Sequence, residues 1–373
     1  MRRENIKGNN FMKIAIIHDY LVNYGGAEKT FKALSEIFPE AELYTLFYDS
    51  KTKQRLFPNK KIHTSFLQKF PLFLRKKYQW LLPLLPIAAE TLDFREFDVV
   101  ISASHSFVKG IITRPKTTHI CYCYSPTRYL WDKARAKFLL HYFRIWDRQA
   151  SERVDQFIAV SRTVQQRISK YYKRDSIVVY PPVEMSNAKI QIVPNQIQNS
   201  KLKTQNSEYY LIVSQLRKYK RIDIAVEAFN KLGLELVIIG EGLEKRGLKS
   251  KANKNIKFLG WQSDEVVAEY YKNCTAFVFP SEDDFGIAPV EAMSYGKPVL
   301  AFRKGGATET VIEGKTGEFF DYQNVAVLAD GIRRLRQNLK NYDPEFIAHH
   351  VQKFNRERFE KEFKNAIDKL ARV

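Results

Sequence analysis

The chain is poor in cysteine, with only three in 373 residues. Three cysteines are too few for a disulfide framework, and this favours a reducing compartment such as the cytoplasm. The sequence has no Cys-x-x-Cys pair and no histidines at the spacing of metal ligands. It therefore predicts no metal site.

Long apolar runs are also missing. No stretch reaches 18 apolar residues, so no membrane-spanning helix is predicted. The opening segment, Met1–Asn10, is basic and polar, and it lacks the apolar region of a signal peptide. We expect residues 1–11 to form a disordered tail. The protein is expected in the cytoplasm, either free or as a peripheral protein on the inner face of the membrane.

Negative charge is scarce relative to positive charge. The chain has 61 Lys and Arg residues against 41 Asp and Glu, a formal net charge of +20. Such an excess suits a polyanion or an anionic surface. The basic residues are spread along the chain, and no aromatic-basic or helix-turn-helix pattern accompanies them, so a nucleic acid is not expected as a partner.

The segment Phe70–Phe94 offers another explanation of the positive charge. It combines Arg75-Lys76-Lys77 with Trp80 and several leucines. Basic residues at the lipid headgroups and apolar residues below them would fit an anionic membrane surface. The alternative is a helix that faces the core and is interrupted by Pro83 and Pro86.

Apolar runs of strand length alternate with helical patterns in two blocks. The first block begins with Lys13–His18 and the second with Tyr210–Ser214. This alternation predicts an α/β protein with two Rossmann-like, doubly wound domains. Neither block has GxGxxG after its first strand, which disfavours a nicotinamide-dependent enzyme. The expected organisation is a tail over 1–11, an N-terminal domain over 12–185, a polar linker over 186–208, a C-terminal domain over 209–350 and a terminal helix over 351–373.

The most informative segment is 280–299. A short apolar strand ends at Phe279, and an acidic loop containing Asp283 follows it. After Phe285-Gly286 a helix is expected from Ile287, with Glu291 eight positions after Asp283. Ligands of open α/β sheets bind at the carboxyl ends of the strands, and a helix N-terminus there favours phosphate. The pattern predicts a nucleotide-sugar site.

These residues resemble the donor-binding signature of retaining family-4 glycosyltransferases of the GT-B fold. The family shows Glu, seven residues and a second Glu, with Phe-Gly after the first acid. Asp283 stands at the first position and Glu291 at the second. The resemblance implies two Rossmann-like domains that face a cleft, and a C-terminal helix that crosses back to the first domain. It also places the chain in the mannosyltransferase-like branch.

The resemblance also implies roles for residues of the donor site. Glu291 would bind the ribose, Asp283 would hold sugar hydroxyls, and Lys220 would stabilise the departing diphosphate. Asp283, Lys220 and His105 are the predicted catalytic residues. The Gly305-Gly306 turn is expected to offer free amides to an anion. The full set of predicted donor contacts is Gly26, Arg217, Lys220, Phe285, Gly286, Ile287, Ala288 and Glu291.

The acceptor side is expected in the first domain. Asp19, Gly25 and Tyr124 are its predicted residues, with His105 nearby. Each has a simpler interpretation, which stays open here. Asp19 would cap a turn, Gly25-Gly26 would form a turn with positive φ, and His105 would be a hydrogen-bonded loop residue.

The predicted activity is metal-independent, retaining transfer of a hexose, with mannose from GDP-mannose as the first choice. The acceptor would be a saccharide or a lipid-linked saccharide in cell-envelope polysaccharide synthesis. No cofactor is expected besides the nucleotide-diphosphate sugar as co-substrate. Three positions depart from the family pattern: Gln215 replaces Arg, Asp283 replaces Glu, and Tyr124 replaces His. They leave open a catalytically weak relative that only binds a sugar nucleotide.

Overall fold

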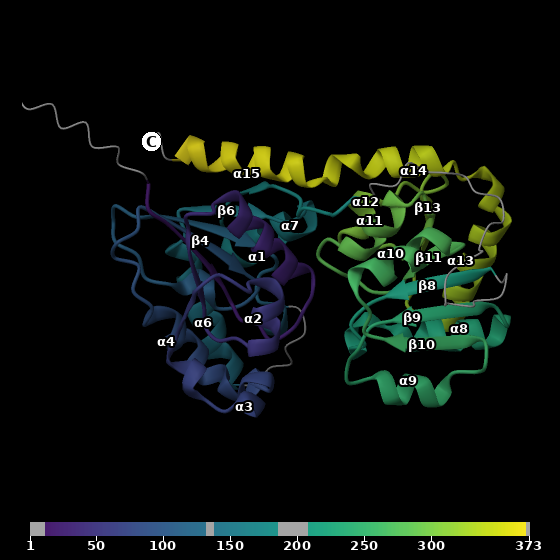
Figure 1. Ribbon diagram of the computed structural model, residues 1–373, viewed down its shortest axis with the longest axis horizontal. Helices are drawn as coiled ribbons and strands as arrows, with labels where there is room; N and C mark the ends of the chain where they lie inside the picture. Colours follow the sequence, from purple (N-terminus) through teal and green to yellow (C-terminus); the bar gives the residue numbers. More distant parts are fainter. Residues whose placement is uncertain (1–11, 132–137, 186–207, 371–373) are drawn as a thin grey trace, which may run out of the picture. The chain divides into compact units, whose positions relative to one another are not determined.

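The computed structural model describes residues 12–131, 138–185 and 208–370. The predicted tail and almost all of the predicted linker lie outside these residues. The chain divides into two compact units, one comprising Met1–Tyr180 and Glu360–Val373, the other Pro181–Phe359. We call them unit 1 and unit 2 (Figure 1).

Unit 1 is built on a sheet of seven parallel strands in the order β3-β2-β1-β4-β5-β6-β7. The central strands β1 and β4 are buried along their whole length, as expected when helices cover both faces of a parallel sheet. The strand order reverses between β1 and β4, which makes their carboxyl ends the switch point of this sheet. The strands are β1 Ile14–His18, β2 Glu42–Thr45, β3 Ile62–Thr64, β4 Val99–Ser104, β5 Thr118–Cys123, β6 Gln156–Ala159 and β7 Ser176–Val178.

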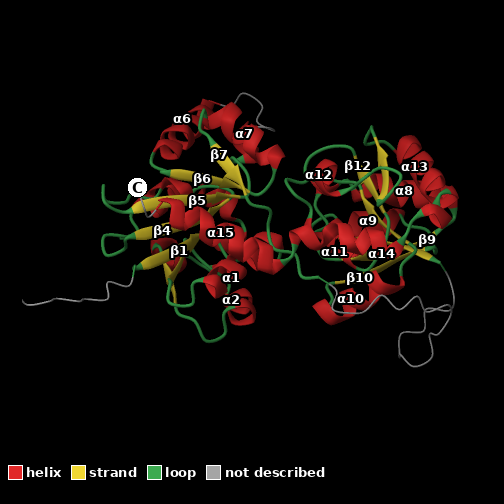
Figure 2. Cartoon of the chain, turned by 90° about the horizontal axis from the view of Figure 1, so that it is seen from above, coloured by secondary structure: helices red, strands yellow, loops and turns green. Residues whose placement is uncertain are grey.

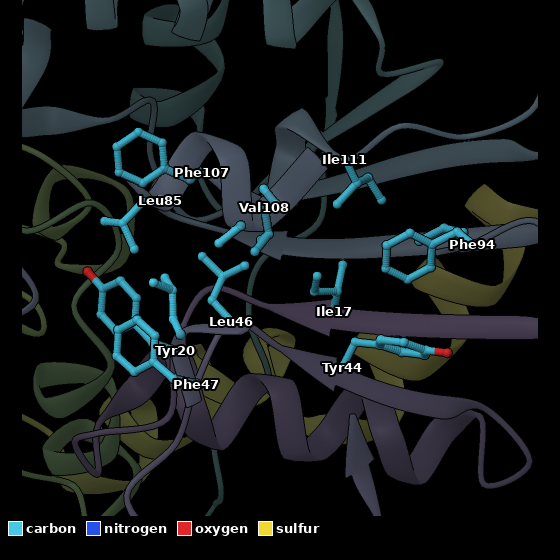
Figure 3. Close-up of a cluster of buried hydrophobic side chains, with 14 of the residues drawn as sticks. Ile17, Tyr20, Tyr44, Leu46, Phe47, Leu85, Phe94, Phe107, Val108 and Ile111 are labelled. Carbon is cyan, nitrogen blue, oxygen red and sulfur yellow. The ribbon is translucent and has the colours of Figure 1, made fainter. Parts of the chain in front are cut away.

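The helices of unit 1 pack on this sheet (Figure 2). One large apolar cluster joins β1 and β2 to α4 and η3, and includes Ile17, Leu46, Leu85 and Phe107 (Figure 3). Burial of these side chains is the main stabilising term of the unit. The helices are α1 Gly26–Ile37, α2 Ser50–Leu56, η1 Phe66–Lys69, α3 Leu72–Lys76, η2 Tyr78–Leu84, α4 Leu85–Glu90, η3 Val108–Gly110, α5 Arg128–Trp131, α6 Phe138–Glu152 and α7 Arg162–Tyr172.

Unit 2 repeats the plan with six parallel strands in the order β10-β9-β8-β11-β12-β13. Its order reverses between β8 and β11. The strands are β8 Tyr209–Val213, β9 Glu235–Ile239, β10 Ile256–Gly260, β11 Ala276–Phe279, β12 Val299–Phe302 and β13 Gly317–Phe320. The helices are η4 Lys218–Lys220, α8 Ile222–Leu232, α9 Lys245–Lys251, α10 Asp264–Asn273, α11 Ile287–Ser294, α12 Ala307–Thr310, α13 Val325–Gln337, η5 Leu339–Asn341, α14 Pro344–His350 and η6 Val351–Phe354.

The last helix, α15 (Arg356–Leu370), begins in unit 2 and ends in unit 1. Its apolar stripe includes Phe363, whose ring lies 5.6 Å from that of Tyr122 and 6.4 Å from that of Phe38. The chain thus returns to the first sheet, and the predicted fold of two Rossmann-like sheets is confirmed. Within the described residues, no helix is both long and apolar enough to cross a membrane.

Candidate functional site

The switch point of unit 2 brings two predicted site residues together. The loop after β8 leads into η4, which ends at Lys220, and the loop after β11 contains Asp283. Because β8 and β11 are neighbours, these loops meet at one edge of the sheet. The Lys220 Nζ lies 2.5 Å from Oδ2 of Asp283. The edge therefore carries an ammonium group and a carboxylate in direct contact.

The environment keeps Lys220 charged. Its side chain is 14% exposed and that of Asp283 is 19% exposed. Desolvation acts to lower the pKa of Lys220, but the opposite charge and hydrogen bond of Asp283 outweigh it and raise the pKa. A phosphate group that reaches this edge would meet an ammonium already held in position.

Glu291 is held from a neighbouring helix. It is the fifth residue of α11, and its Oε2 accepts a 3.0 Å hydrogen bond from the hydroxyl of Tyr271 in α10. The Tyr271 ring is buried and stacks on Tyr295 at 5.8 Å. Burial, followed by the charge of Glu291, raises the pKa of Tyr271, so the phenol remains a donor. No sequence motif indicates Tyr271, since 20 residues separate it from its partner.

The start of α11 follows from Phe285 and Gly286. The Phe285 ring is buried and packs edge-on against Phe354 at 5.4 Å. Gly286 has φ +87, a left-handed conformation that costs glycine little. The first residues of α11, Ile287 and Ala288, are half-buried, and amides in the first turn of a helix lack intrahelical acceptors. Phe285 and Gly286 therefore set the position at which α11 begins, and with it the direction of the amides in its first turn.

The Gly305-Gly306 turn has a structural role beside the anion-binding role predicted for it. The amide of Gly306 donates to the carbonyl of Asp283 at 2.9 Å, so it is already engaged. A Cβ on Gly305 would lie 2.2 Å from the carbonyl oxygen of Asp283, and one on Gly306 would lie 2.2 Å from Cα of Phe285. The glycine pair supports the acidic loop because its backbone is in contact with the backbone of Asp283 and Phe285.

A second glycine pair supports the loop after β8 in the same way. A Cβ on Gly240 would lie 1.9 Å from the carbonyl oxygen of Ser214, and one on Gly242 would lie 2.1 Å from that of Leu216. The Leu216 amide also donates to the carbonyl of Glu241 at 2.9 Å. Both loops of the edge are thus supported by glycine turns. The loop after β8 packs on the turn after its neighbour β9, and the loop after β11 packs on the turn after its neighbour β12.

Arg217 stands in the loop between β8 and η4 and is half-buried. Within the part of the chain that the structure describes, its guanidinium group makes no hydrogen bond or ion pair. Gln215, where the family has Arg, lies two residues before it. Arg217 therefore supplies an uncommitted positive charge two positions from the expected one.

The switch point of unit 1 holds Asp19, which follows β1 and is fully buried. Its carboxylate accepts from the backbone amides of residues 105–108 at 2.7 to 3.0 Å and from the Ser104 hydroxyl at 3.3 Å. Burial alone would raise the pKa of Asp19, but the nearby histidines and the amides lower it. The structure thus gives Asp19 the turn-capping role, with no exposed surface for an acceptor hydroxyl.

His105 links this buried carboxylate to the surface. Its Nδ1 lies 3.1 Å from Oδ2 of Asp19, and its Nε2 lies 3.0 Å from the Tyr20 hydroxyl. The imidazole is 29% exposed. His18, whose ring lies 5.8 Å from that of His105, is fully buried, and burial followed by the charge of His105 lowers its pKa to about 4. His18 is therefore neutral at ordinary pH, and His105 is the histidine of this pair that reaches solvent.

Tyr124 connects the loop after β5 to the glycine loop. Its hydroxyl donates to the carbonyl of Ala27 at 2.9 Å, in the first turn of α1. Gly25 precedes that helix with φ −148, and neither Gly25 nor Gly26 has a positive φ. The alternative of a turn that needs positive φ is therefore wrong, because the backbone there is extended.

Two features of unit 1 are not indicated by any sequence motif. Glu28 in α1 is buried, and desolvation raises its pKa to about 7. Lys109 and Asp147 form a buried ion pair of 2.5 Å. The Asp147 carboxylate also accepts from Thr127, Trp131 and Tyr172. This pair fixes the loop after Tyr124, and its members are too distant in sequence for a motif to reveal.

The predicted site residues thus form two groups. Asp283, Lys220, Arg217, Phe285, Gly286, Ile287, Ala288 and Glu291 lie at the switch edge of unit 2, while Asp19, Gly25, Gly26, His105 and Tyr124 lie at that of unit 1. Among the described residues, no group of three or more His, Cys, Asp or Glu side chains is placed to hold a metal ion.

Family models match both units. The model described as Glycosyltransferase Family 4 matches residues 24–187, and that described as Glycosyl transferases group 1 matches residues 194–348. The chain belongs to the group 1 glycosyltransferases. The recognition made from the motif 280–299 is therefore confirmed at the level of the family.

Relatives of this glycosyltransferase are distant in sequence. An uncharacterized glycosyltransferase of Methanocaldococcus jannaschii is 24% identical over 88% of this chain and 89% of its own length. The alpha-1,3/1,6-mannosyltransferase ALG2 of Dictyostelium discoideum is 26% identical, with 60% of this chain and 63% of the relative covered.

Solved structures establish the fold of this glycosyltransferase as GT-B. The lipopolysaccharide outer core galactosyltransferase WaaB superposes with a TM-score of 0.68 at 21% identity, covering 97% of this chain and 100% of that one. Anabaena HepE in complex with UDP-glucose gives a TM-score of 0.71 at 19% identity, with 96% and 100% covered.

Proposed function

We propose that this glycosyltransferase moves a hexose, with retention of anomeric configuration, from a nucleotide-diphosphate sugar to a saccharide or lipid-linked acceptor. The observation that carries the proposal is the Lys220–Asp283 pair at the switch edge of unit 2, beside α11 with Glu291. One edge thus offers a cation and helix amides for phosphate and two carboxylates for hydroxyl groups.

Each side chain has a distinct chemical task in this proposal. Glu291 accepts hydrogen bonds from the ribose hydroxyls. Asp283 accepts from hydroxyls of the transferred sugar. As the bond between the anomeric carbon and the phosphate oxygen breaks, negative charge grows on the diphosphate, and Lys220 stabilises that charge. A leaving-phosphate oxygen takes the acceptor proton, so neither a metal nor a cofactor is needed.

The residues of unit 1 would bind the acceptor, and Gly26 would contact the donor. His105 and the Gly25-Gly26 loop are the groups available there, because Asp19 is buried and the Tyr124 hydroxyl is bonded to Ala27. His105 would donate to a sugar hydroxyl from Nε2, which would exchange the Tyr20 hydroxyl for the sugar. Its contact with Asp19 through Nδ1 would fix the imidazole orientation during that exchange.

Mannose from GDP-mannose is the first choice of donor. ALG2 relatives are named mannosyltransferases, and the chain resembles the mannosyltransferase-like branch. HepE bound to UDP-glucose and the galactosyltransferase WaaB make a UDP-hexose the main competitor. We place the reaction in the cytoplasm, in cell-envelope polysaccharide synthesis.

The deciding experiment is a thermal-shift screen of the purified protein against GDP, UDP, ADP and their sugar conjugates, with EDTA present. A ligand that binds only the folded state raises the melting temperature by mass action. A shift with one base names the donor class and supports metal independence. A screen in which no nucleotide raises the midpoint would count against the donor site at this edge.

A catalytically weak sugar-nucleotide-binding relative is the second candidate. It is favoured by Gln215 and by Asp283, whose side chain is shorter than that of Glu and is already paired with Lys220. The melting temperature of such a protein would rise with a nucleotide. It would nevertheless release no nucleoside diphosphate from the donor when a panel of acceptors is added. Donor hydrolysis or transfer above the level of a Lys220→Ala variant would exclude it.

A further inference from the structure

Positive charge is concentrated in one of the two units. Unit 1 contains 35 Lys and Arg residues against 19 Asp and Glu, whereas unit 2 contains 26 against 22. Most of the net charge of +20 therefore belongs to unit 1. Residues 50–89 contain nine Lys and Arg residues and no Asp or Glu. This run of 40 residues includes α2, α3, η2 and most of α4.

The segment from α3 to α4 has two sides. Leu85, Ala88 and Ala89 are buried in the core cluster of unit 1, as the interpretation of a core-facing helix predicts, and Leu85 is labelled in Figure 3. Other apolar residues of the segment are exposed. Three large ones, one in each of α3, η2 and α4, have exposed fractions of 60% for Phe73, 68% for Trp80 and 50% for Ile87.

Basic side chains stand among these exposed apolar residues. The Lys77 Nζ lies 5.0 Å from the centre of the Trp80 ring. Lys76 is 52% exposed and makes one ion pair, of 3.6 Å, with Asp49. We define the α3–α4 face as the exposed set Leu72, Phe73, Lys76, Lys77, Trp80 and Ile87.

Arg75 has a different task. Its guanidinium donates to the carbonyls of Phe70 and Tyr48. These bonds fasten α3 to the loop after β2, so the α3–α4 face is held on a fixed scaffold. Arg75 is therefore a structural residue and a poor choice for a binding test.

We propose that the α3–α4 face docks on an anionic lipid bilayer. Isolated apolar residues on a surface are ordinary, but four within 16 residues, interleaved with lysines and free of acids, match the requirements of a headgroup layer. Trp is favoured at that depth because its ring is apolar and its N–H is polar. A nucleic acid would be served by the lysines but would gain nothing from Leu72, Phe73 and Ile87.

The inference is independent of the donor site, because it predicts binding without nucleotide. The test is co-sedimentation of the whole protein with phosphatidylcholine vesicles, with and without phosphatidylglycerol. Binding is expected only when the anionic lipid is present, and it should weaken as salt is added. Each lysine removed from such a face should weaken binding about fivefold.

The variant Lys76→Ser/Lys77→Ser should therefore bind anionic vesicles about 25-fold more weakly, at about fivefold for each lysine. Its control is Lys249→Ser/Lys251→Ser in α9 of unit 2, which removes the same charge and also one weak ion pair, of 4.0 Å with Glu227. The control should bind like the parent protein. Equal losses of vesicle binding in both variants would show that only the net charge of the protein matters. That result would overturn the assignment of the α3–α4 face.

A second measurement locates the contact. Brominated phosphatidylcholine, mixed into the anionic vesicles, quenches tryptophans that enter the bilayer. The parent protein should be quenched, and Trp80→Phe should lose that quenching while keeping its melting temperature and most of its vesicle binding. Quenching that survives in Trp80→Phe would move the contact elsewhere. If the protein bound a DNA duplex but not vesicles, the proposal would be wrong and the partner of the α3–α4 face would be a nucleic acid.

Discussion

The hydroxyl of Tyr271 donates a 3.0 Å hydrogen bond to Oε2 of Glu291, across the contact between α10 and α11. A carboxylate on a helix has several rotamers, and this bond selects one of them. Tyr271 is thus expected to position Glu291 for the ribose rather than to touch the nucleotide. Tyr271 is thus a positioning residue of the donor site, and its effect on nucleotide binding can be measured separately from that of Glu291.

Glu291→Ala should weaken nucleoside-diphosphate binding by about 10- to 100-fold, since it removes hydrogen bonds to a charged acceptor. Tyr271→Phe should weaken it less, by about threefold to tenfold. Both losses should vanish with a 2′,3′-dideoxy nucleotide, as measured by calorimetric titration. Tyr322→Phe, at a tyrosine that follows β13 and is 70% exposed, is the control for loss of a phenol hydroxyl and should bind normally. A Tyr271→Phe loss that persists with the dideoxy nucleotide would show only a structural role.

Lys220 and Asp283 are in contact yet should respond differently to substitution. Lys220→Ala should lower both diphosphate affinity and the transfer rate, the latter by about 100-fold, because charge on the leaving group loses its partner. Asp283→Asn should keep or raise the affinity for the free nucleoside diphosphate while abolishing transfer, since it releases Lys220 from a competing carboxylate. Titration and product assays on both variants separate these effects. Parallel losses of diphosphate affinity would contradict the assigned division of labour.

Acid should destabilise unit 1 through two buried histidines. Burial lowers the pKa of His18 and of His119 from 6.5 to about 4. The unfolded chain therefore binds more protons than the folded one as pH falls from 6.5 towards 4, which costs up to about 3 kcal/mol per histidine. Glu28 opposes this, because its raised pKa of about 7 makes the folded state the better proton binder between pH 4.5 and 7.

The net result should be a melting temperature that falls between pH 6.5 and 5. Calorimetric scans across this range should show a shallower fall for His119→Gln and a steeper one for Glu28→Gln. The slope, rather than the absolute stability, carries the prediction. An unchanged slope in His119→Gln would mean that His119 titrates alike in the folded and unfolded chain.

Gly306→Ala should damage the donor site without touching any ligand. Its Cβ would lie 2.2 Å from Cα of Phe285, so the acidic loop must move. We expect lost donor affinity and a lower melting temperature. Gly247→Ala, in α9, is the matched control, because its Cβ would meet nothing within 4 Å. That variant should be stabilised by about 0.5–1 kcal/mol, and a similar gain in Gly306→Ala would refute the clash.

The sequence predicted what lies close together along the chain. The motif 280–299 placed Asp283 and Glu291 correctly relative to β11 and α11, because strand, loop and helix are consecutive there. It could not reveal Tyr271, nor the amides of residues 105–108 that saturate Asp19, because these partners meet only through the sheet order.

The roles of glycine pairs are hard to predict from the sequence for a related reason. A glycine pair after a strand suits an anion and also suits a passing backbone, and the sequence does not distinguish the two. In the structure, Gly305-Gly306 packs against the backbones of Asp283 and Phe285. For Phe70–Phe94 both interpretations had a basis, because the segment has one buried and one exposed apolar side.

The glycine turns beneath the two loops of unit 2 have a consequence for recombination between members of this family. Each loop is fitted to a turn that follows a different strand, and a Cβ on the turn glycines would lie only 1.9 to 2.2 Å from the backbone of the loop, which leaves no room for a methyl group. A chimaera that imports a foreign acidic loop would have to import its turn as well. Altered donor preference in such enzymes is therefore expected to be inherited in pairs of segments, Ser214–Leu216 with Gly240–Gly242 and Asp283–Phe285 with Gly305–Gly306.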